Sequence, residues 1–326
     1  MVITMEHGSG GFASAKLMSD LFGRYFKSEY LDNLEDAAIL ELNGKVAFCT
    51  DSFVVTPLVF KGGDIGKLSI CGTVNDLLSM GAEPKYISCG FILEEGLEMA
   101  LLEKVVASMA DTANSAGVKI VAGDTKVIGG NSGLFINTAG IGIVPGDRNI
   151  RAANIKPGDA IILSGNLGDH HACILSARMG IENEIKSDCA CLTDVSQALF
   201  EGEIQVNAMR DVTRGGLATV LNELAYSAGC GIELLENNIP VSEQVMSLCS
   251  ILGLDPLYMG NEGKMAIAVP ACDAEKAVSL MRSTKNGKNA AIIGKAVQPS
   301  GVFLKTKIGG TRKLDVLKGE GLPRIC

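Results

Sequence analysis

Apolar and polar residues recur along the chain with two different periods, and the changes between them outline alternating strands and helices. The pattern predicts strands over 37–42, 46–50, 86–93, from 119, and over 134–144, 160–164, 232–235, 265–269 and 291–297. It predicts helices over 12–26, 65–80, 98–116, 170–179, 217–228, 241–252 and 274–281. Because strands and helices alternate on a similar scale in both halves, we expect an α+β (α/β) chain of two domains.

Turn sequences at 145–148 and 155–159 separate the two halves. We therefore predict an N-terminal domain over 1–150, a C-terminal domain over 151–315 and a flexible tail over 316–326 that ends in Leu322-Pro323-Arg324-Ile325-Cys326. Terminal residues are mobile, so this thiol suits an arm that carries a group on sulfur into a pocket. The alternative is a chance cysteine at a frayed end.

Composition narrows the class of protein. The 326 residues carry a formal charge of −8, no Trp and only 5% aromatic side chains, which argues against a nucleic-acid-binding surface. Ten cysteines occur without a paired CxxC spacing, as expected in a reducing cytosol. The chain has no signal sequence and no apolar run of membrane length, so we expect a soluble, cytoplasmic protein that binds neither nucleic acid nor membrane.

Several carboxylates stand where predicted strands end. Asn43-Gly44 is a strong hairpin signal, which would place Asp36 beside Asp51 at one edge of a sheet. Asp76 lies among apolar helix residues, and Asp124 is expected with Lys126 where a strand runs into a loop. Carboxylates near a lysine suit a nucleotide triphosphate with Mg²⁺, which takes few protein ligands. A solvated sheet end and an outward-facing Asp76 are the alternatives.

Other polar positions also allow two interpretations. Gly8-Ser9-Gly10-Gly11 precedes a helix, so its backbone N–H groups form either a phosphate cradle or a flexible lead-in. The same choice applies to the stretch 209–216, for which the alternative is an internal ion pair between Asp211 and an arginine. Each remaining candidate likewise has a plain structural alternative: Asp64 as a helix N-cap, Arg148 as a domain contact and Glu262 as a turn residue. His170 and His171 are adjacent and cannot share a helix face, which favours capping or domain contact over metal binding.

Taken together, these motifs resemble a known family nearly end to end. The sequence is similar to the aminoimidazole ribonucleotide synthetase-like superfamily, which includes selenophosphate synthetase, and within it to the HypE family of carbamoyl dehydratases in hydrogenase maturation. The motifs are 7–11, 34–38, 50–52, 75–82, 122–126, 210–216, 261–263 and 323–326. The ending Pro323-Arg324-Ile325-Cys326 is the HypE-specific one, and the glycine loop lacks the Cys of a selenophosphate synthetase. One departure is His171, where relatives commonly have glycine, and we assign it no chemistry.

The resemblance implies a two-domain synthetase-like fold, a homodimer with a shared N-terminal sheet, and ATP and Mg²⁺ at that interface. It implies metal ligands, namely Asp36, Asp51, Asp76 and Asp124. It implies nucleotide contacts, namely Gly8, Ser9, Gly10, Gly11, Asp64, Asn75, Thr125 and Arg148. It implies catalytic roles for Cys326, Glu262 and Lys126. The implied partners are a HypF-type carbamoyltransferase and a HypC–HypD-type iron scaffold.

The implied reaction is ATP-dependent dehydration of a carbamoyl group on Cys326 to a thiocyanate. Glu262 would take a proton, Lys126 would neutralise developing charge, and the four Asp side chains would hold Mg²⁺ against phosphates. Two alternatives remain at this stage: a sister synthetase that phosphorylates a free small molecule, and a thiol carrier that binds nucleotide without turnover.

Overall fold

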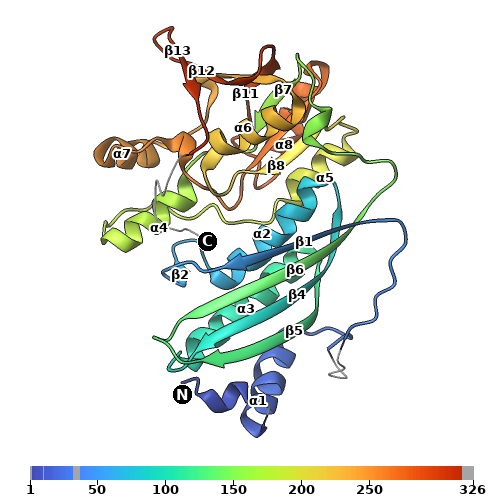
Figure 1. Ribbon diagram of the computed structural model, residues 1–326, viewed down its shortest axis with the longest axis vertical. Helices are drawn as coiled ribbons and strands as arrows, with labels where there is room; N and C mark the ends of the chain where they lie inside the picture. The colour runs from blue at the N-terminus through green and yellow to red at the C-terminus, as the bar shows by residue number, and fades with distance from the viewer. Residues whose placement is uncertain (1, 10, 32–36, 318–326) are drawn as a thin grey trace.

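The computed structural model describes residues 2–9, 11–31 and 37–317, which form two large sheets with helices packed against them and a two-stranded ribbon of β2 and β3 (Figure 1). The N-terminal sheet has the strand order β1-β6-β4-β5, and α2 and α3 cover one of its faces. Its elements are β1 (Lys45–Phe53), α2 (Ile65–Ser79), β4 (Glu83–Glu94), α3 (Met99–Ala116), β5 (Lys119–Ile128) and β6 (Leu134–Val144). Smaller elements are η1 (Met5–Gly8), α1 (Phe12–Leu17), η2 (Met18–Gly23), β2 (Val59–Phe60) and β3 (Gly63–Asp64).

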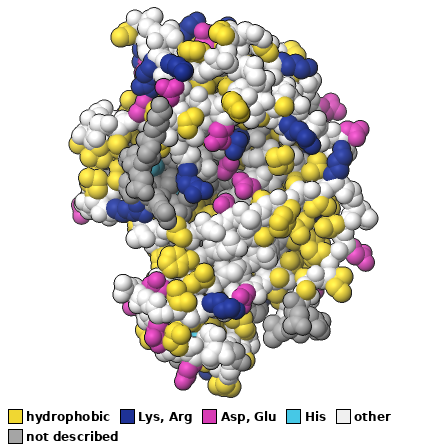
Figure 2. All heavy atoms as spheres, viewed as in Figure 1, with side chains coloured by type: hydrophobic (Ala, Val, Ile, Leu, Met, Phe, Trp, Pro, Cys, Tyr) yellow, Lys and Arg dark blue, Asp and Glu magenta, His cyan; other side chains and the backbone are white. Residues whose placement is uncertain are grey.

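The two faces of this sheet differ in burial. Along β6, alternate residues from Leu134 onward are buried against the helices, while those between them are half-buried or exposed. The uncovered face presents Val46, Phe48 and Ile92, and Phe48 is 70% exposed. Figure 2 shows hydrophobic side chains gathered over this region. An apolar sheet face is unusual on a free surface and is typical of an interface.

The C-terminal sheet has the order β13-β12-β9-β11-β7-β10-β8. Its strands are β7 (Ala160–Leu163), β8 (Ala208–Asp211), β9 (Gly231–Leu235), β10 (Met265–Val269), β11 (Ala291–Val297), β12 (Gly301–Lys305) and β13 (Thr311–Leu314). Its helices are α4 (Asp169–Met179), α5 (Thr193–Glu201), α6 (Gly216–Ala228), α7 (Glu243–Leu252) and α8 (Ala274–Arg282). Single turns are η3 (Ala152–Asn154), η4 (Glu236–Asn238), η5 (Pro256–Tyr258) and η6 (Ala271–Asp273). The central strands β7 and β10 are buried throughout.

Most predicted elements are confirmed, and the strands β6, β10 and β11 have the predicted bounds. The hairpin around Asn43-Gly44 is wrong, because residues 37–44 form no strand and Ile39 is 89% exposed. The partner of β1 is β6 instead, paired from Lys45↔Val144 to Phe53↔Ile136. The local turn signal therefore indicates the wrong neighbour for β1. A hairpin at Asn43-Gly44 gives no ground for placing Asp36 beside Asp51.

Five further elements differ from prediction. Asp124 and Lys126 lie inside β5 rather than in a loop after it, and Arg210 and Asp211 end the short strand β8. The helix α5 and the hairpin of β12 and β13 were not predicted. Short elements with charged residues carry little periodic signal, since a four-residue strand offers only two positions per face.

Candidate functional site

A cleft of about 370 Å³ opens between the two halves of the chain. The N-terminal half contributes β1 and α2, and the C-terminal half contributes β8, the loop after it, α6 and the turn before β10. The charged side chains that line it are Asp51, Asp76, Arg210, Asp211, Arg214, Glu223 and Glu262. Sequence analysis anticipated Asp51, Asp76 and Glu262, and the structure brings these three into one cleft.

Two features bring Asp51 and Asp76 close together. They are the alternation of side chains along β1 and the glycine at position 72 of α2. Asp51 pairs with Thr138 of β6, so its side chain shares the face covered by α2. At Gly72 of α2, an added Cβ would lie 2.9 Å from the Phe53 ring and 3.5 Å from Oδ2 of Asp51. Asp76 follows Gly72 one turn later on the same helix. The close approach of β1 to α2 thus places both carboxyl groups at the cleft.

The carboxyl groups of the cleft repel one another in a poorly solvated site. Burial, together with the charges of Asp211 and Asp51, raises the pKa of Asp76 to about 7. Burial also raises the pKa of Asp211 to about 6 and that of Asp51, although Arg214 opposes the shift at Asp51. Clustered carboxylates with raised pKa values are typical of functional sites and favour a bound cation.

Glu262 is 4% exposed, and burial, followed by the nearby Cys189 and Asp211, raises the pKa of its carboxyl well above the usual range. Its Oε1 is buried and has no hydrogen-bond partner among the residues that the structure describes. Its backbone is fixed, however: the Glu262 N–H donates to Oδ1 of Asp188 over 3.2 Å. The turn that carries Glu262 is thus held in place at the cleft, and one oxygen of its carboxyl group has no bonded partner among the described residues.

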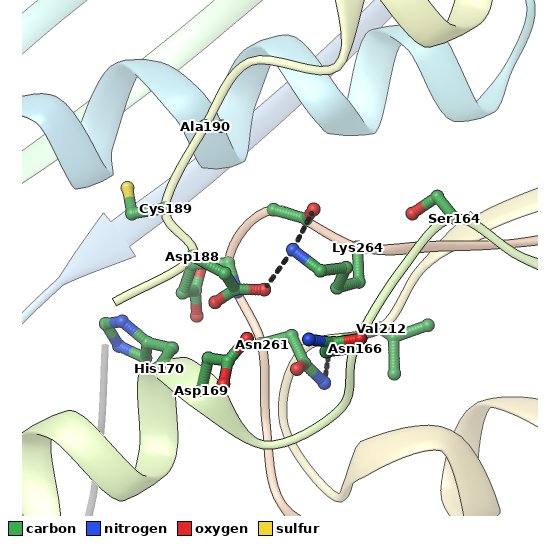
Figure 3. A network of polar contacts seen from close by, with 12 residues as sticks. Ser164, Asn166, Asp169, His170, Asp188, Cys189, Ala190, Val212, Asn261 and Lys264 are labelled. Atoms are coloured by element: carbon green, nitrogen blue, oxygen red, sulfur yellow. Dashed lines mark hydrogen bonds and ion pairs between the residues drawn. The ribbon is translucent and has the colours of Figure 1, made fainter. Parts of the chain in front are cut away.

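A buried polar network supports this turn (Figure 3). Nζ of Lys264 lies 3.0 Å from Oδ2 of Asp188 and donates to the Gly263 carbonyl over 3.0 Å. Asn261 is fully buried; its Oδ1 accepts from the Gly168 N–H and its Nδ2 donates to the Val212 carbonyl. At Gly263 an added Cβ would lie 1.9 Å from the Asp188 carbonyl, which only glycine avoids. The residues around Glu262 are thereby packed without room for adjustment.

The glycine-rich segment before α6 brings two arginines to the cleft. Gly215 and Gly216 have φ of +79° and +66°, a region that favours glycine. The sequence of this segment is compatible with either an anion cradle or an internal ion pair between Asp211 and an arginine. In the structure, Arg210 forms an ion pair with Glu223 instead, over 2.9 Å. Arg210 and Arg214 provide positive charge beside the carboxyl groups, which suits a phosphorylated substrate.

Asp124 and Lys126 lie elsewhere. Asp124 is in register with Gly90 of β4 and hence with Asn137 and Ser52, so it points to the uncovered face, opposite to Asp51. Nζ of Lys126 lies 2.6 Å from Asp124 Oδ1 on this exposed face. Gly8 of η1 packs against Val127, which brings the glycine-rich opening to the same strand. Within one chain the predicted carboxylate set is therefore divided between two faces.

The other predicted residues serve structural contacts. Asp64 caps α2, with Oδ1 accepting from the Lys67 N–H over 2.9 Å. Asn75 is 2% exposed and is bonded to the Ala190 carbonyl and the Leu192 N–H. Arg148 donates to the Gly81 carbonyl and lies 3.9 Å from the Phe200 ring centroid, which matches its domain-contact alternative. Thr125 is half-buried on β5, and Ser9 and Gly11 flank the start of α1.

Three predicted residues, Gly10, Asp36 and Cys326, lie outside the described residues. His170 makes a contact between the two halves, with its ring edge-on against Phe60 of β2. His171 bonds within the C-terminal half instead, where its Nδ1 accepts from the Gly260 N–H. Burial lowers the pKa of His171 to about 4. Across residues 2–9, 11–31 and 37–317, no group of three or more His, Cys, Asp or Glu could hold a metal ion.

This fold and cleft define a class of two-domain synthetase-like proteins. Residues 34–144 match the family model "AIR synthase related protein, N-terminal domain", and residues 156–307 match the corresponding C-terminal domain model. The chain is 48% identical to carbamoyl dehydratase HypE of Escherichia coli K12 and 46% identical to that of Rhodobacter capsulatus, covering 99% and 98% of those proteins and 99% of itself. The chain belongs to the HypE family of carbamoyl dehydratases.

Solved structures of HypE proteins have the same fold as this chain. A crystal structure of the hydrogenase maturation protein HypE in complex with ATP matches with a TM-score of 0.95 and 47% identity, over 99% of both chains. A HypE–HypF complex matches with a TM-score of 0.81 and 43% identity, over 92% of this chain and 99% of that one. Thiamine-monophosphate kinase of Stenotrophomonas maltophilia, at 18% identity, shares the fold. None of the described helices is long and apolar enough to span a bilayer.

Proposed function

We propose that this protein dehydrates a carbamoyl group carried on the Cys326 sulfur to a thiocyanate at the expense of ATP, as a cyanide source for [NiFe] hydrogenase iron centres. The observation that carries the proposal is the buried Glu262 carboxyl group, held by its backbone in a cleft with Arg210 and Arg214. Proton abstraction needs such a fixed, unpartnered oxygen. The similarity to HypE over 99% of the chain supports the substrate class.

The route of the tail to this cleft follows from where the described chain ends. The Leu317 N–H donates to Oγ1 of Thr219 on α6, and the next residue of α6, Val220, lines the cleft. Nine residues follow Leu317, and the last of them is Cys326. Nine extended residues span at most about 30 Å, which supports a tail that folds back from α6 into this cleft.

The chemistry divides among the residues of the cleft. The carbamoyl oxygen attacks the γ-phosphorus of ATP and ADP leaves; phosphate then departs from carbon as the nitrogen loses its protons, which leaves S–C≡N. Glu262 takes a proton from that nitrogen, and Arg210 and Arg214 stabilise the negative charge that builds up on the transferred phosphoryl group. Without phosphorylation the carbamoyl oxygen would be a poor leaving group.

Asp51 and Asp76 are the carboxylates that fit Mg²⁺, because their mutual charge and burial disfavour ionisation in the absence of a cation. Since the described residues alone form no complete metal site, phosphate and water would supply the other ligands, as Mg²⁺ prefers. Mg²⁺ would neutralise phosphate charge there. We assign Asp36 and Asp124 to the same nucleotide, contributed across the dimer.

A homodimer would explain why the candidate nucleotide-binding residues lie on both faces of the N-terminal sheet. The uncovered face carries exposed apolar Val46, Phe48 and Ile92 beside Asp124 and Lys126. Burying this face against a second copy would bring Lys126 to a shared nucleotide site at β5, the strand that also carries Thr125 and contacts Gly8. The relative solved with ATP supports nucleotide binding.

The partners follow from the reaction. A HypF-type carbamoyltransferase must load the thiol, and a solved HypE–HypF complex supports this pairing. A HypC–HypD-type scaffold would receive the cyano group on iron. The nine described cysteines are free thiols, as expected in the reducing cytoplasm where we place the reaction.

Mass spectrometry of the tail peptide tests the proposal. With a HypF-type partner, carbamoyl phosphate and ATP, the peptide ending in Cys326 should gain a carbamoyl group and then lose one water with Mg-ATP. Cys326→Ser should abolish both changes, whereas Cys272→Ser, at an exposed thiol, should preserve them. A Cys326→Ser protein that still turns over ATP with a free substrate would indicate the sister synthetase. Loading without dehydration would indicate a carrier.

A further inference from the structure

Three thiols meet where the two halves of the chain touch. Cys71 lies on α2 and is fully buried, whereas Cys189 and Cys191 lie on the segment that leads into α5. The Sγ atoms of Cys191 and Cys71 are 3.6 Å apart, and the Cys71 thiol also contacts Cys189. In Figure 3 the Cys189 sulfur points toward α2. Neither the reaction nor the fold accounts for three adjacent thiols at this junction.

Both halves hold these sulfurs in place. Asn75, one turn after Cys71 on α2, donates to the Ala190 carbonyl over 3.0 Å and accepts from the Leu192 N–H over 2.9 Å. The two bonds bracket Cys191, whose own carbonyl accepts from Asn286 over 3.3 Å. The contact between Cys71 and Cys191 is thus fixed by bonds on either side of it.

We propose that Cys71 and Cys191 are a peroxide-sensitive disulfide site that links the two domains beside the catalytic cleft. Cys191 is half-buried, whereas Cys71 is buried, so Cys191 is the thiol assigned to meet peroxide. The Cys191 sulfur attacks one peroxide oxygen, the O–O bond breaks, and a sulfenic acid and water form. The Cys71 sulfur then attacks the Cys191 sulfur, the S–O bond breaks, and the Cys71 proton leaves with the hydroxyl as water. Two thiols lose two electrons, which reduce one peroxide to two waters.

The disulfide acts on the site through the segment that carries Cys191. Closing the contact from 3.6 Å to an S–S bond of about 2 Å pulls this segment toward α2. The same segment holds Glu262, because Asp188 accepts from the Glu262 N–H and the Ala190 N–H donates to the Glu262 carbonyl. A displacement of about 1 Å at a catalytic group can cost about a hundredfold in rate. This consequence, unlike the disulfide itself, rests on the proposed function.

Non-reducing peptide mapping of the full chain tests the disulfide. After hydrogen peroxide treatment, a peptide pair joining Cys71 to Cys191 should appear and should vanish with dithiothreitol. Cys191→Ser should abolish it, and Cys272→Ser should leave it unchanged. Oxidation of Cys191 to sulfinic acid without a disulfide, or cross-links that never include Cys71, would overturn the proposal. Because Cys191 is only half-buried, its serine variant should fold, and a circular dichroism spectrum checks this.

The activity measurement is separate. The tail is first carbamoylated, so that Cys326 has no free thiol, and peroxide is added before Mg-ATP. Wild type should then dehydrate at least tenfold more slowly, with recovery in dithiothreitol, while Cys191→Ser keeps its rate. Equal slowing of both proteins would overturn the effect on the site. If no dehydration occurs even without peroxide, the proposed function fails while the peptide map still decides the disulfide.

Discussion

Lys264 and Asp188 form an ion pair of 3.0 Å whose side chains are only 11% and 4% exposed. Breaking a buried pair leaves one charge without compensation, which typically costs about 3–5 kcal/mol. We expect Lys264→Met to lower the free energy of unfolding by that amount, measured by urea denaturation. Asp188→Asn should have a similar effect. Since each single change strands the other partner, the double variant should cost less than the sum.

The matched control is Lys119→Met, which removes a pair with Glu29 whose side chains are 52% and 58% exposed. Exposed pairs contribute at most about 1 kcal/mol, so this change should alter the midpoint of unfolding little. Equal losses for Lys264→Met and Lys119→Met would show that the Asp188 carboxylate does not depend on its buried partner.

The sequence predicted the long, regular elements because their periodicity is maintained over many residues. Leu134–Val144 has only two polar side chains, Asn137 and Thr138, and Met265–Val269 is apolar throughout, so both strands were located. Asn43-Gly44 failed because a turn signal is local, while β1 pairs with residues more than 80 positions away. Pairing between residues so far apart cannot be predicted from a short stretch of sequence.

The site could be predicted only in part, because the arrangement of its residues also depends on long-range pairing. Asp51, Asp76 and Glu262 line one cleft, but the separation of Asp124 depends on the direction in which side chains alternate along β5. A register shift between Ile87 and Ser88 of β4 leaves Val121 of β5 without a partner, and Asp124 comes into register with Gly90 on the uncovered face. One extra residue reverses the direction of every side chain that follows. Neither the irregularity nor the contribution of Asp211 could be inferred from residue types alone.

Glu262→Gln should lower the dehydration rate by about 10²–10⁴ while preserving the shape of the cleft. Its effect on stability should depend on pH with a defined sign. The pKa of Glu262 is raised by burial above its usual value of 4.5, so folding favours the protonated form. The resulting stability is present below pH 4.5 and is lost as pH rises toward the folded-state pKa. Glu262→Gln should therefore be the more stable protein at pH 8.

Urea denaturation at pH 4 and pH 8 measures this difference, which should shrink at the lower pH. Glu103→Gln is a useful comparison, because its half-exposed carboxyl group accepts hydrogen bonds from Arg24 and Tyr25 and should not favour the variant at pH 8. A Glu262→Gln protein that dehydrates at the normal rate would remove the assignment of this residue as the base.

Asp76→Asn should stabilise the metal-free protein and abolish its response to Mg²⁺. The pKa of Asp76 is raised to about 7 by burial and by Asp211 and Asp51, so ionisation above that pH opposes folding. Removing the charge should add about 0.5–2 kcal/mol at pH 8, as functional-site substitutions often do. Thermal unfolding with and without Mg-ATP measures both effects. Asp111→Asn, on the exposed side of α3, should change neither.

Asn75→Ala should weaken the junction between the domains without touching the cleft directly. It removes the two bonds to the Ala190 carbonyl and the Leu192 N–H and leaves those buried groups unpaired, at about 1–3 kcal/mol. Because these bonds also hold Cys191 against Cys71, the disulfide should form more slowly under peroxide than in wild type. Asn114→Ala, at an exposed position of α3, is the control for both measurements. Unchanged disulfide formation in Asn75→Ala would mean that the contact between the two sulfurs is maintained by the packing of Cys71 and Cys189 rather than by the amide bracket.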